Sequence, residues 1–354
     1  MTRTRRRVVF ALAAVLIACV ASVAAFFALD LYVHKRAERS AGVNVWGYRG
    51  PVAPRKAPGE VRVVVLGGST VFGYGLTWED ALPAQLERRL RRAGARMRFS
   101  VVNLGYNNEG AYSFRFTLED FAYLQPDIVC LYEGYNDLMG DGNGGNPTVY
   151  RHSSPLFRAT GYFPLLPLVL HEKAMALRYG GNLNAAYHAE GKTVFQPTLA
   201  ARATSGALDA AATVGNSIER QLARLNGGPQ AVPARDASTG CPYPWTMYCR
   251  DVVAAIDYAV SKQWRVVFVT QPHLATPRAR ESHISQQQAV AEMLDRRYSG
   301  RRDLQRIDLG DALDLHDASL AFDGMHLTAA GNARIADLLS QPILNAIADR
   351  QAVR

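Results

Sequence analysis

Hydrophobic residues follow two different patterns along this chain. Positions 8–29 form one apolar run without a charged residue. From position 61 onward, short and almost continuously apolar runs alternate with longer amphipathic stretches. Strands that are buried on both faces of a parallel sheet have this unbroken apolar character. The predicted strands are residues 61–66, 98–103, 127–132 and 265–270, and a weaker 304–309.

Amphipathic helices are predicted between and after these strands. Strands and helices in alternation predict a three-layer α/β/α sandwich on a five-stranded parallel sheet, with right-handed crossovers. In such a fold, functional groups gather at the carboxyl ends of the strands, so chemistry is expected directly after each strand. The helix candidates are residues 81–93, 113–124, 251–262, 281–298 and 329–349.

The apolar run at 8–29 is long enough to cross a membrane. Its 22 residues would span about 33 Å as a helix, against about 30 Å of bilayer core and about 7–15 residues in a secretory signal. The run is therefore predicted to be a retained transmembrane signal anchor. The alternatives are cleavage after the small residues near 21–25 and lipidation at Cys19, which follows a lipobox-like Leu-Ile-Ala. Hydrophobicity that continues to position 29 argues against both.

Charge at the N-terminus predicts the orientation of the anchor. An arginine cluster precedes the run and outweighs the basic residues after it, which favours a cytoplasmic tail at 1–7. The main domain would then lie on the periplasmic side of a bacterial inner membrane. Residues 30–60 are interpreted as a juxtamembrane linker and 61–350 as the globular domain. An insertion at about 138–250, rich in glycine clusters and prolines, would be a lid, a substrate wall or a structural excursion.

The overall charge does not indicate a nucleic-acid partner. The chain has a formal net charge of +9, but residues 1–39 hold seven basic and two acidic residues and so contribute +5. The remaining +4 is spread over the rest of the chain, without a basic run or a nucleic-acid module. A composition of 48% apolar and 20% charged residues excludes a disordered or fibrous chain.

The four cysteines differ in their surroundings. Cys19 lies in the apolar run and Cys130 in a predicted strand, whereas Cys241 and Cys249 share a loop with proline and tyrosine. In an exported domain this last pair would form a disulfide, and two free thiols are the alternative.

A hydroxyl group lies in a glycine-rich turn after the first predicted strand. Residues 67–75 read Gly-Gly-Ser-Thr-Val-Phe-Gly-Tyr-Gly. Such a turn can expose Ser69 at the edge of the sheet, with backbone N–H groups free to bind an anion. A helix N-cap and a phosphate-binding loop are the alternatives, but the lysine of a P-loop is absent.

Three further blocks follow later strands. Gly105 follows the second strand and would let a backbone N–H approach a substrate, and Asn136 follows the third and offers an amide donor to an oxyanion. Asp323 and His326 follow the last strand, so that the carboxylate can hold Nδ1–H while Nε2 takes a proton from serine. Each block alone would be read as ordinary turn or surface residues. Their occurrence in this order after successive strands favours one site.

With these blocks the chain resembles the SGNH hydrolase superfamily of GDSL-like lipases and esterases. The resemblance covers about 61–347, apart from the insertion. It implies the flavodoxin-like SGNH fold, no metal and no organic cofactor. It further implies Ser69 as nucleophile, His326 as base oriented by Asp323, and an oxyanion hole made by the N–H groups of Ser69 and Gly105 and the amide of Asn136.

The chain departs from the family pattern in two places. Gly68 replaces the aspartate of the usual Gly-Asp-Ser block, as in a Gly-Gly-Ser-Thr variant of the family. The second block ordinarily has a further glycine about three residues after the oxyanion glycine, whereas here Tyr-Asn-Asn-Glu precede Gly110. This longer loop would reshape the pocket or bring Glu109 to its rim. His273, after the fourth strand, would border the site without a catalytic duty.

The expected function is hydrolysis of an acyl ester through an acyl-enzyme on Ser69. The substrate would be a small molecule, a lipid or an acylated glycan, and the apolar run would bind the membrane. One alternative is an O-acyltransferase or O-deacetylase of cell-envelope polysaccharide, which uses the same acyl-enzyme. A second is a non-catalytic binding protein, which would have no need to keep the triad and oxyanion residues together.

Overall fold

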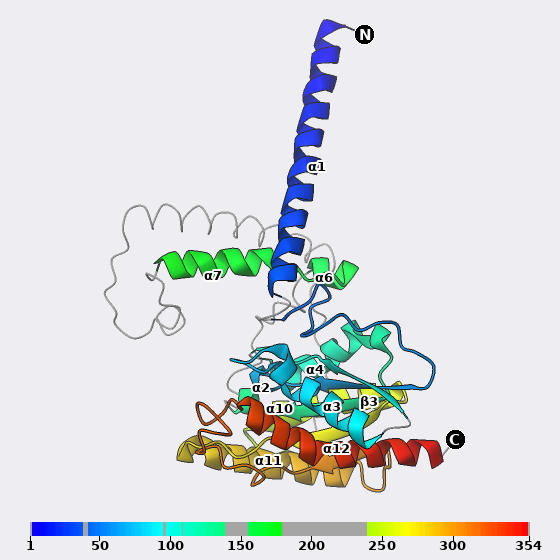
Figure 1. Cartoon of the computed structure of the whole chain (residues 1–354), viewed down its shortest axis with the longest axis vertical. Helices are drawn as coiled ribbons and strands as arrows, with labels where there is room; N and C mark the ends of the chain where they lie inside the picture. Colours follow the sequence, from blue (N-terminus) through cyan, green and yellow to red (C-terminus); the bar gives the residue numbers. More distant parts are fainter. Residues whose placement is uncertain are drawn as a thin grey trace.

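A five-stranded parallel sheet forms the centre of the molecule in the computed structural model (Figure 1). The structure describes residues 2–37, 42–94, 97–107, 109–138, 155–178 and 239–352. The strand order is β2-β1-β3-β4-β5, and every neighbouring pair is parallel. The strands are β1 (Glu60–Leu66), β2 (Arg98–Asn103), β3 (Ile128–Glu133), β4 (Arg265–Thr270) and β5 (Leu304–Ile307).

These strands confirm the predicted sheet; the limits of β1 and β3 differ from the prediction by one residue, and the edge strand β5 is shorter than predicted. The second and fourth strands have the predicted limits, whereas β5 ends at Ile307 instead of 309. The cause is a side-chain network at the end of β4. The Thr270 hydroxyl donates to Asp308 at 2.8 Å and accepts the Leu309 N–H at 3.1 Å. These contacts replace the ladder hydrogen bonds that would have extended the strand.

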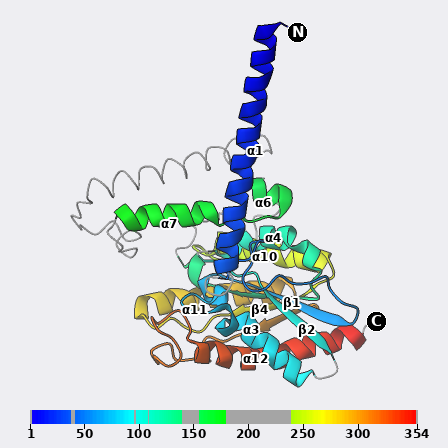
Figure 2. The same ribbon diagram turned by 45° about the horizontal axis from the view of Figure 1, so that its top comes forward.

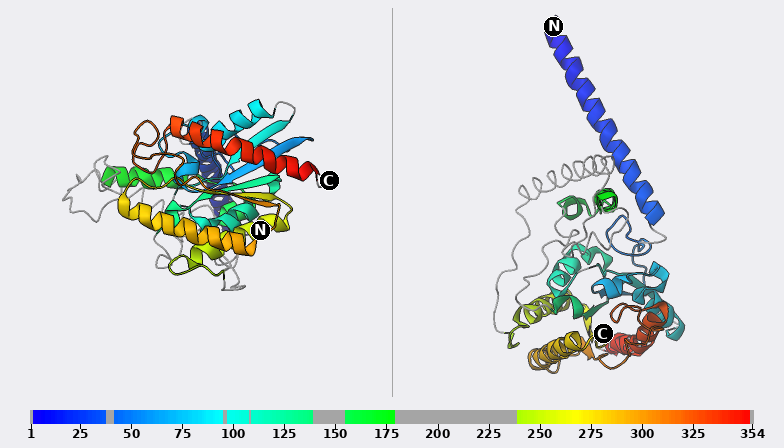
Figure 3. Two further views of the ribbon diagram at one scale, coloured as in Figure 1. Left: turned by 90° about the horizontal axis from the view of Figure 1, so that it is seen from below. Right: turned by 90° about the vertical axis from the view of Figure 1, so that its left-hand side faces the viewer.

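Helices cover both faces of the sheet and complete the predicted three layers (Figure 3). The helices α3 (Leu82–Ala93) and α12 (Ala329–Ala352) pack on one face. The other face carries α4 (Ala111–Asp120), α10 (Thr246–Ser261) and α11 (Pro277–Arg297). Short elements complete the domain: α2 (Ser69–Phe72), η1 (Trp78–Asp80), η2 (Ala122–Leu124) and η3 (Tyr135–Asp137).

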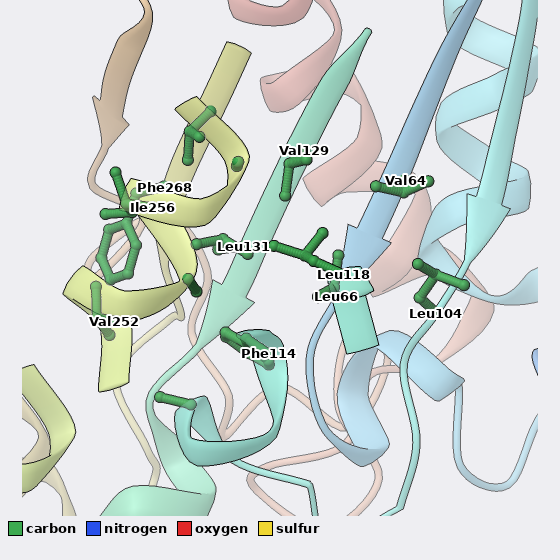
Figure 4. Close-up of a cluster of buried hydrophobic side chains, with 14 of the residues drawn as sticks. Val64, Leu66, Leu104, Phe114, Leu118, Val129, Leu131, Val252, Ile256 and Phe268 are labelled. Carbon is green, nitrogen blue, oxygen red and sulfur yellow. The ribbon is translucent and has the colours of Figure 1, made fainter. Parts of the chain in front are cut away.

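The two-sided cover explains why the central strands β1, β3 and β4 are almost continuously apolar. Val64, Leu66, Val129 and Leu131 point to the face of α4 and α10, where Figure 4 shows them among other buried side chains. The alternate residues of the same strands, such as Val63, point to the face of α3 and α12. Burying each such side chain stabilises the fold by about 1.5–3 kcal/mol.

The N-terminal helix α1 (Arg3–Ala37) extends away from this domain (Figure 2). It includes the predicted span 8–29, and large apolar side chains such as Phe10 and Leu16 are exposed along it. Among the described residues it is the one helix that is long and apolar enough to cross a membrane, with a mean hydropathy of 2.8 over an 18-residue window. It is therefore a candidate membrane span.

The segment between α1 and β1, expected to be a linker, packs against the domain from residue 42 onward. Tyr48 is 1% exposed and Arg49 is 4% exposed. Part of the expected insertion is helical, as α6 (Pro155–Thr160) and α7 (Leu166–Arg178), and its last residues already belong to α10. Residues 139–154 and 179–238 of that insertion lie outside the described part of the chain.

Candidate active site

Ser69 is the first residue of the short helix α2, directly beyond the end of β1. Two glycines before it allow the turn to lie close to β3. A Cβ at position 67 would lie 2.3 Å from the Tyr132 carbonyl, and one at 68 would lie 2.0 Å from Asn136 Nδ2. The absence of a side chain at position 68 therefore gives Asn136 room to approach the turn that carries Ser69.

Ser69, His326 and Asp323 form one chain of hydrogen bonds. The distance from His326 Nε2 to Ser69 Oγ is 2.8 Å, and that from His326 Nδ1 to Asp323 Oδ2 is 2.6 Å. Asp323 Oδ1 accepts the backbone N–H groups of Met325 at 3.0 Å and His326 at 2.7 Å. Gly324 has a φ of +76°, which allows the tight turn that brings the aspartate and the histidine together.

Electrostatics keep the Asp323 carboxyl ionised. Burial raises its pKa, but the hydrogen bonds that it accepts from the backbone and the imidazole of His326 outweigh burial and hold this pKa below its usual range. An ionised carboxylate can only accept a hydrogen bond. A neutral His326 imidazole that contacts it through Nδ1 therefore carries its proton on Nδ1. Nε2 is then the acceptor for the Ser69 hydroxyl proton.

Two aromatic rings flank the imidazole of His326. The ring centroid of Tyr74 lies 4.9 Å from that of His326, and the Phe322 ring lies nearly parallel to it at 5.8 Å. Both aromatic side chains are about half exposed, Tyr74 at 50% and Phe322 at 47%. They restrict the orientation of the imidazole and give the rim of the site an apolar surface.

Asn136 lies beside the nucleophile turn with an exposed side chain. Its Nδ2 donates one hydrogen to the Glu109 carbonyl at 2.7 Å. An amide nitrogen carries two hydrogens, and within the described residues the second has no acceptor. The contact with Glu109 thus fixes the amide and leaves one N–H available to a ligand.

The role predicted for Gly105 conflicts with its contacts. Its backbone N–H donates to Asn103 Oδ1 at 3.0 Å and is thereby occupied. A Cβ at this position would lie 2.7 Å from both the Phe72 nitrogen and Val71 Cβ. Gly105 is therefore needed for close packing under α2 and does not supply a free oxyanion donor. The later glycine, Gly110, is the N-cap of α4.

Two buried side chains for which the sequence indicated no specific role connect the turns of the site. Gln271, which is 1% exposed, accepts the Tyr135 N–H at 2.9 Å and donates to the Thr70 hydroxyl at 2.7 Å. It thereby links Thr70, which follows Ser69, to Tyr135, which precedes Asn136. The only sequence signal was a polar residue directly after the fourth strand.

Glu133 is the second of these buried connections. The Asn136 N–H donates to its Oε1 at 3.4 Å, and the backbone N–H groups of Gly68 and Gly134 interact electrostatically with the same carboxyl. Burial raises the pKa of Glu133 well above its usual range, the nearby Asp137 carboxyl adds to this rise, and the three N–H groups oppose it. The sequence signal was a charged residue at the end of an otherwise apolar strand.

The remaining predicted residues lie away from the triad contacts. His273 contacts Asp311 and Gln287, each at 3.0 Å, and takes no part in the hydrogen bonds of Ser69. Cys241 is disulfide-bonded to Cys249, with the Cα atoms 6.4 Å apart. In the described ranges no group of three or more histidine, cysteine or acidic side chains has a metal-binding arrangement.

Comparisons with known proteins find likeness in solved structures. No protein-family model and no curated protein matches the chain. A lipolytic protein of the G-D-S-L family from Desulfitobacterium hafniense has a TM-score of 0.42 and 11% identity, over 79% of this chain and 98% of that one. A GDSL-like lipase from Bacteroides thetaiotaomicron has a TM-score of 0.40 and 12% identity, over 83% and 93%. An acetylxylan esterase variant from Geobacillus stearothermophilus has a TM-score of 0.42 and 11% identity, over 81% and 94%. At these values, function has to be argued from the residues of the site.

Proposed function

We propose that this chain is a serine hydrolase of acyl esters, with Ser69 as nucleophile. The observation that carries the proposal is the unbroken series of hydrogen bonds from Ser69 Oγ through His326 to Asp323. Such a series lets Nε2 take the hydroxyl proton as Oγ attacks the ester carbonyl. The imidazolium then protonates the leaving alkoxide, which leaves an acyl-enzyme on Ser69. Water, activated by the same imidazole, hydrolyses this intermediate.

The negative charge that develops on the carbonyl oxygen needs donors on the side opposite His326. We propose two groups for this task, the backbone N–H of Ser69 at the start of α2 and the second amide hydrogen of Asn136. Gly105 is left out of the proposed oxyanion hole because Asn103 occupies its N–H. The hole is therefore proposed with two donors from this chain.

Access of water favours hydrolysis over acyl transfer. The side chain of Asp323 is 41% exposed, and Asn136 is exposed as well. An acyl-enzyme in such a site meets water directly, whereas transfer to a sugar hydroxyl requires that water be kept out. The half-exposed rings of Tyr74 and Phe322 suit the apolar part of an acyl ester.

Hydrolysis and covalent labelling test this function together. The full chain in detergent micelles is expected to hydrolyse p-nitrophenyl acetate, butyrate or octanoate and to react with a fluorophosphonate probe at Ser69, located by peptide mass spectrometry. Absence of both reactions would support a binding protein and overturn the proposal. Labelling of Ser69 without hydrolysis of any ester would replace hydrolysis by transfer to another acceptor.

Removal of the Asn136 amide tests the oxyanion hole. Asn136→Ala is expected to lower kcat about 100- to 1000-fold with little change in KM, as for loss of one oxyanion donor in other hydrolases. Asn107→Ala, in the loop before Glu109, is the control for a lost amide near the site. A kcat of Asn136→Ala within a few-fold of wild type would exclude Asn136 from the hole.

We further propose that α1 anchors the chain in a membrane with the enzyme domain on the outer side. The apolar helix and the arginines before it support this orientation. A C-terminal alkaline phosphatase fusion is expected to be active in bacterial cells and a C-terminal green fluorescent protein fusion dark. The reverse pair of results would place the domain in the cytoplasm.

A further inference from the structure

The residues that follow α1 fold back as a small hairpin on the catalytic end of the sheet. The Asn44 N–H donates to the Tyr48 carbonyl at 2.9 Å, and the Gly50 N–H donates to the Gly42 carbonyl at 2.7 Å. The hairpin is attached to the sheet because the Arg49 N–H donates to the Asn103 carbonyl, at the end of β2, at 3.1 Å. This places the Arg49 side chain next to α2.

The guanidinium of Arg49 binds the carbonyl end of the nucleophile helix. Its Nη1 donates to the carbonyls of Phe72 and of Gly73, the latter at 2.7 Å, and its Nη2 donates to the Leu76 carbonyl. It also lies over the Phe72 ring, 4.3 Å from the centroid. The side chain is almost fully buried, and burial lowers its pKa to about 10, which still leaves it charged at neutral pH.

A helix as short as α2 depends on such contacts. It has four residues, so its last carbonyls lack partners within the helix, and isolated helices of this length are unstable in water. Asn103 Nδ2 donates to the Val71 carbonyl at 3.0 Å, and Arg49 binds the carbonyls that follow. Together they fix the helix whose first residue is Ser69.

The same hairpin is in contact with the end of the N-terminal helix. His34 Nδ1 lies 3.2 Å from the Val43 carbonyl, and its Nε2 lies 2.8 Å from the Phe163 carbonyl. Asp30, one turn earlier, accepts the Leu166 N–H at 2.5 Å. A continuous set of contacts therefore leads from α1 through residues 43–49 to the nucleophile helix.

We propose that Arg49 is a positioning residue that fixes α2, and with it Ser69, from the segment that follows α1. This inference rests on the proposed function. Arg49 touches no reacting atom and acts through the carbonyls of Phe72, Gly73 and Leu76. Lysine would keep the charge but cannot reach several carbonyls with a planar group, so Arg→Lys is not a conservative change at this position.

Arg62 provides a matched control. It is also buried, its guanidinium donates to the carbonyls of Leu124 at 3.1 Å and Pro54 at 2.9 Å, and it forms an ion pair with Glu60 at 2.7 Å. It lies near the start of β1, at the opposite end of the strand from Ser69. Arg62→Lys therefore removes a comparable buried contact without changing α2.

The experiment compares Arg49→Lys and Arg62→Lys in the full chain in detergent micelles. Arg49→Lys is expected to lower kcat and the rate of fluorophosphonate labelling about 10- to 100-fold, with KM changed less than about 3-fold. Arg62→Lys is expected to lower the melting temperature and leave both rates near wild type. Rates are expressed per folded molecule, measured by near-ultraviolet circular dichroism at a temperature where all proteins are folded.

The outcomes separate the two proposals. Wild-type rates in Arg49→Lys, or equal losses of rate in both arginine variants, would overturn the positioning role. Wild-type protein without hydrolysis or labelling would instead overturn the proposed function. If Arg49→Lys does not fold, Asn103→Ser replaces it, because this variant removes the hydrogen bond from Asn103 Nδ2 to the Val71 carbonyl. Asn103→Ser is expected to show the same loss in kcat, and a wild-type kcat in this variant would count against the proposal.

Discussion

Ser69→Ala is expected to lower ester hydrolysis by about 10⁴- to 10⁶-fold, the largest effect of any single substitution in this chain. The substitution removes the oxygen that is proposed to attack the carbonyl, and the substrate would still bind. kcat should therefore fall while KM changes little. Fluorophosphonate labelling should disappear in the same variant, because the probe reacts with the same oxygen.

The control for Ser69→Ala is Ser340→Ala, on the solvent side of α12, where the hydroxyl contacts the Asp337 carbonyl at 2.8 Å. It should leave hydrolysis unchanged. The double variant Ser69→Ala, His326→Ala should be no slower than Ser69→Ala by more than a few-fold, because residues that act as one unit are not additive. Residual hydrolysis within about 10-fold of wild type would show that another group attacks the ester.

Asp323→Asn is expected to lower kcat by about 10⁴-fold at neutral pH. Oδ2 of the Asp323 carboxylate lies 2.6 Å from Nδ1 of His326 and accepts the hydrogen on that nitrogen. The asparagine amide can donate to Nδ1 in its place, which would move the imidazole proton to Nε2 and prevent it from acting as base. Initial rates on a p-nitrophenyl ester between pH 6 and pH 9 would measure the loss.

A second aspartate and histidine pair in the same region serves as the control. Asp314 Oδ1 lies 2.9 Å from His316 Nδ1, and both side chains are mostly exposed. Asp314→Asn should keep wild-type kcat. If Asp323→Asn and Asp314→Asn behave alike, orientation of His326 by Asp323 contributes nothing to turnover, and the triad reduces to a Ser69 and His326 dyad.

The fold places the proposed site through strand order. β1 and β3 are neighbours in the sheet, so the turns after them, with Ser69 and Asn136, meet at one edge. The turn with Asp323 and His326 approaches from beyond β5, and the hydrogen bond from His326 to Ser69 joins residues 257 positions apart. Buried Gln271 and Glu133 fix the spacing between the turns.

The sequence predicted those features that depend on local pattern. Two-sided burial requires unbroken apolar strands, so their number, order along the chain and limits could be read almost residue by residue. The Asp323 and His326 contact lies within one turn of chain, and the glycines around Ser69 mark a close approach of backbone. Local spacing therefore indicated that Asp323 and His326 would be in contact, and the structure has His326 Nδ1 2.6 Å from Asp323 Oδ2.

Other features depend on which distant groups come together. Gly105 was expected to offer a free N–H, but Asn103 Oδ1 accepts a hydrogen bond from it. The side-chain rotamer that allows this bond cannot be predicted from the spacing of residues. Arg49 lies in a stretch with the composition of a solvated linker, yet it is buried on α2. The sequence by itself determined the sheet, the apolar N-terminal helix and the contact between Asp323 and His326, because burial and contacts within one turn of chain produce recognisable local patterns. Only the tertiary structure decided which donors stay free and which buried side chains fix the turn that carries Ser69. Hydrogen bonds between segments that are far apart in the chain produce no local sequence pattern.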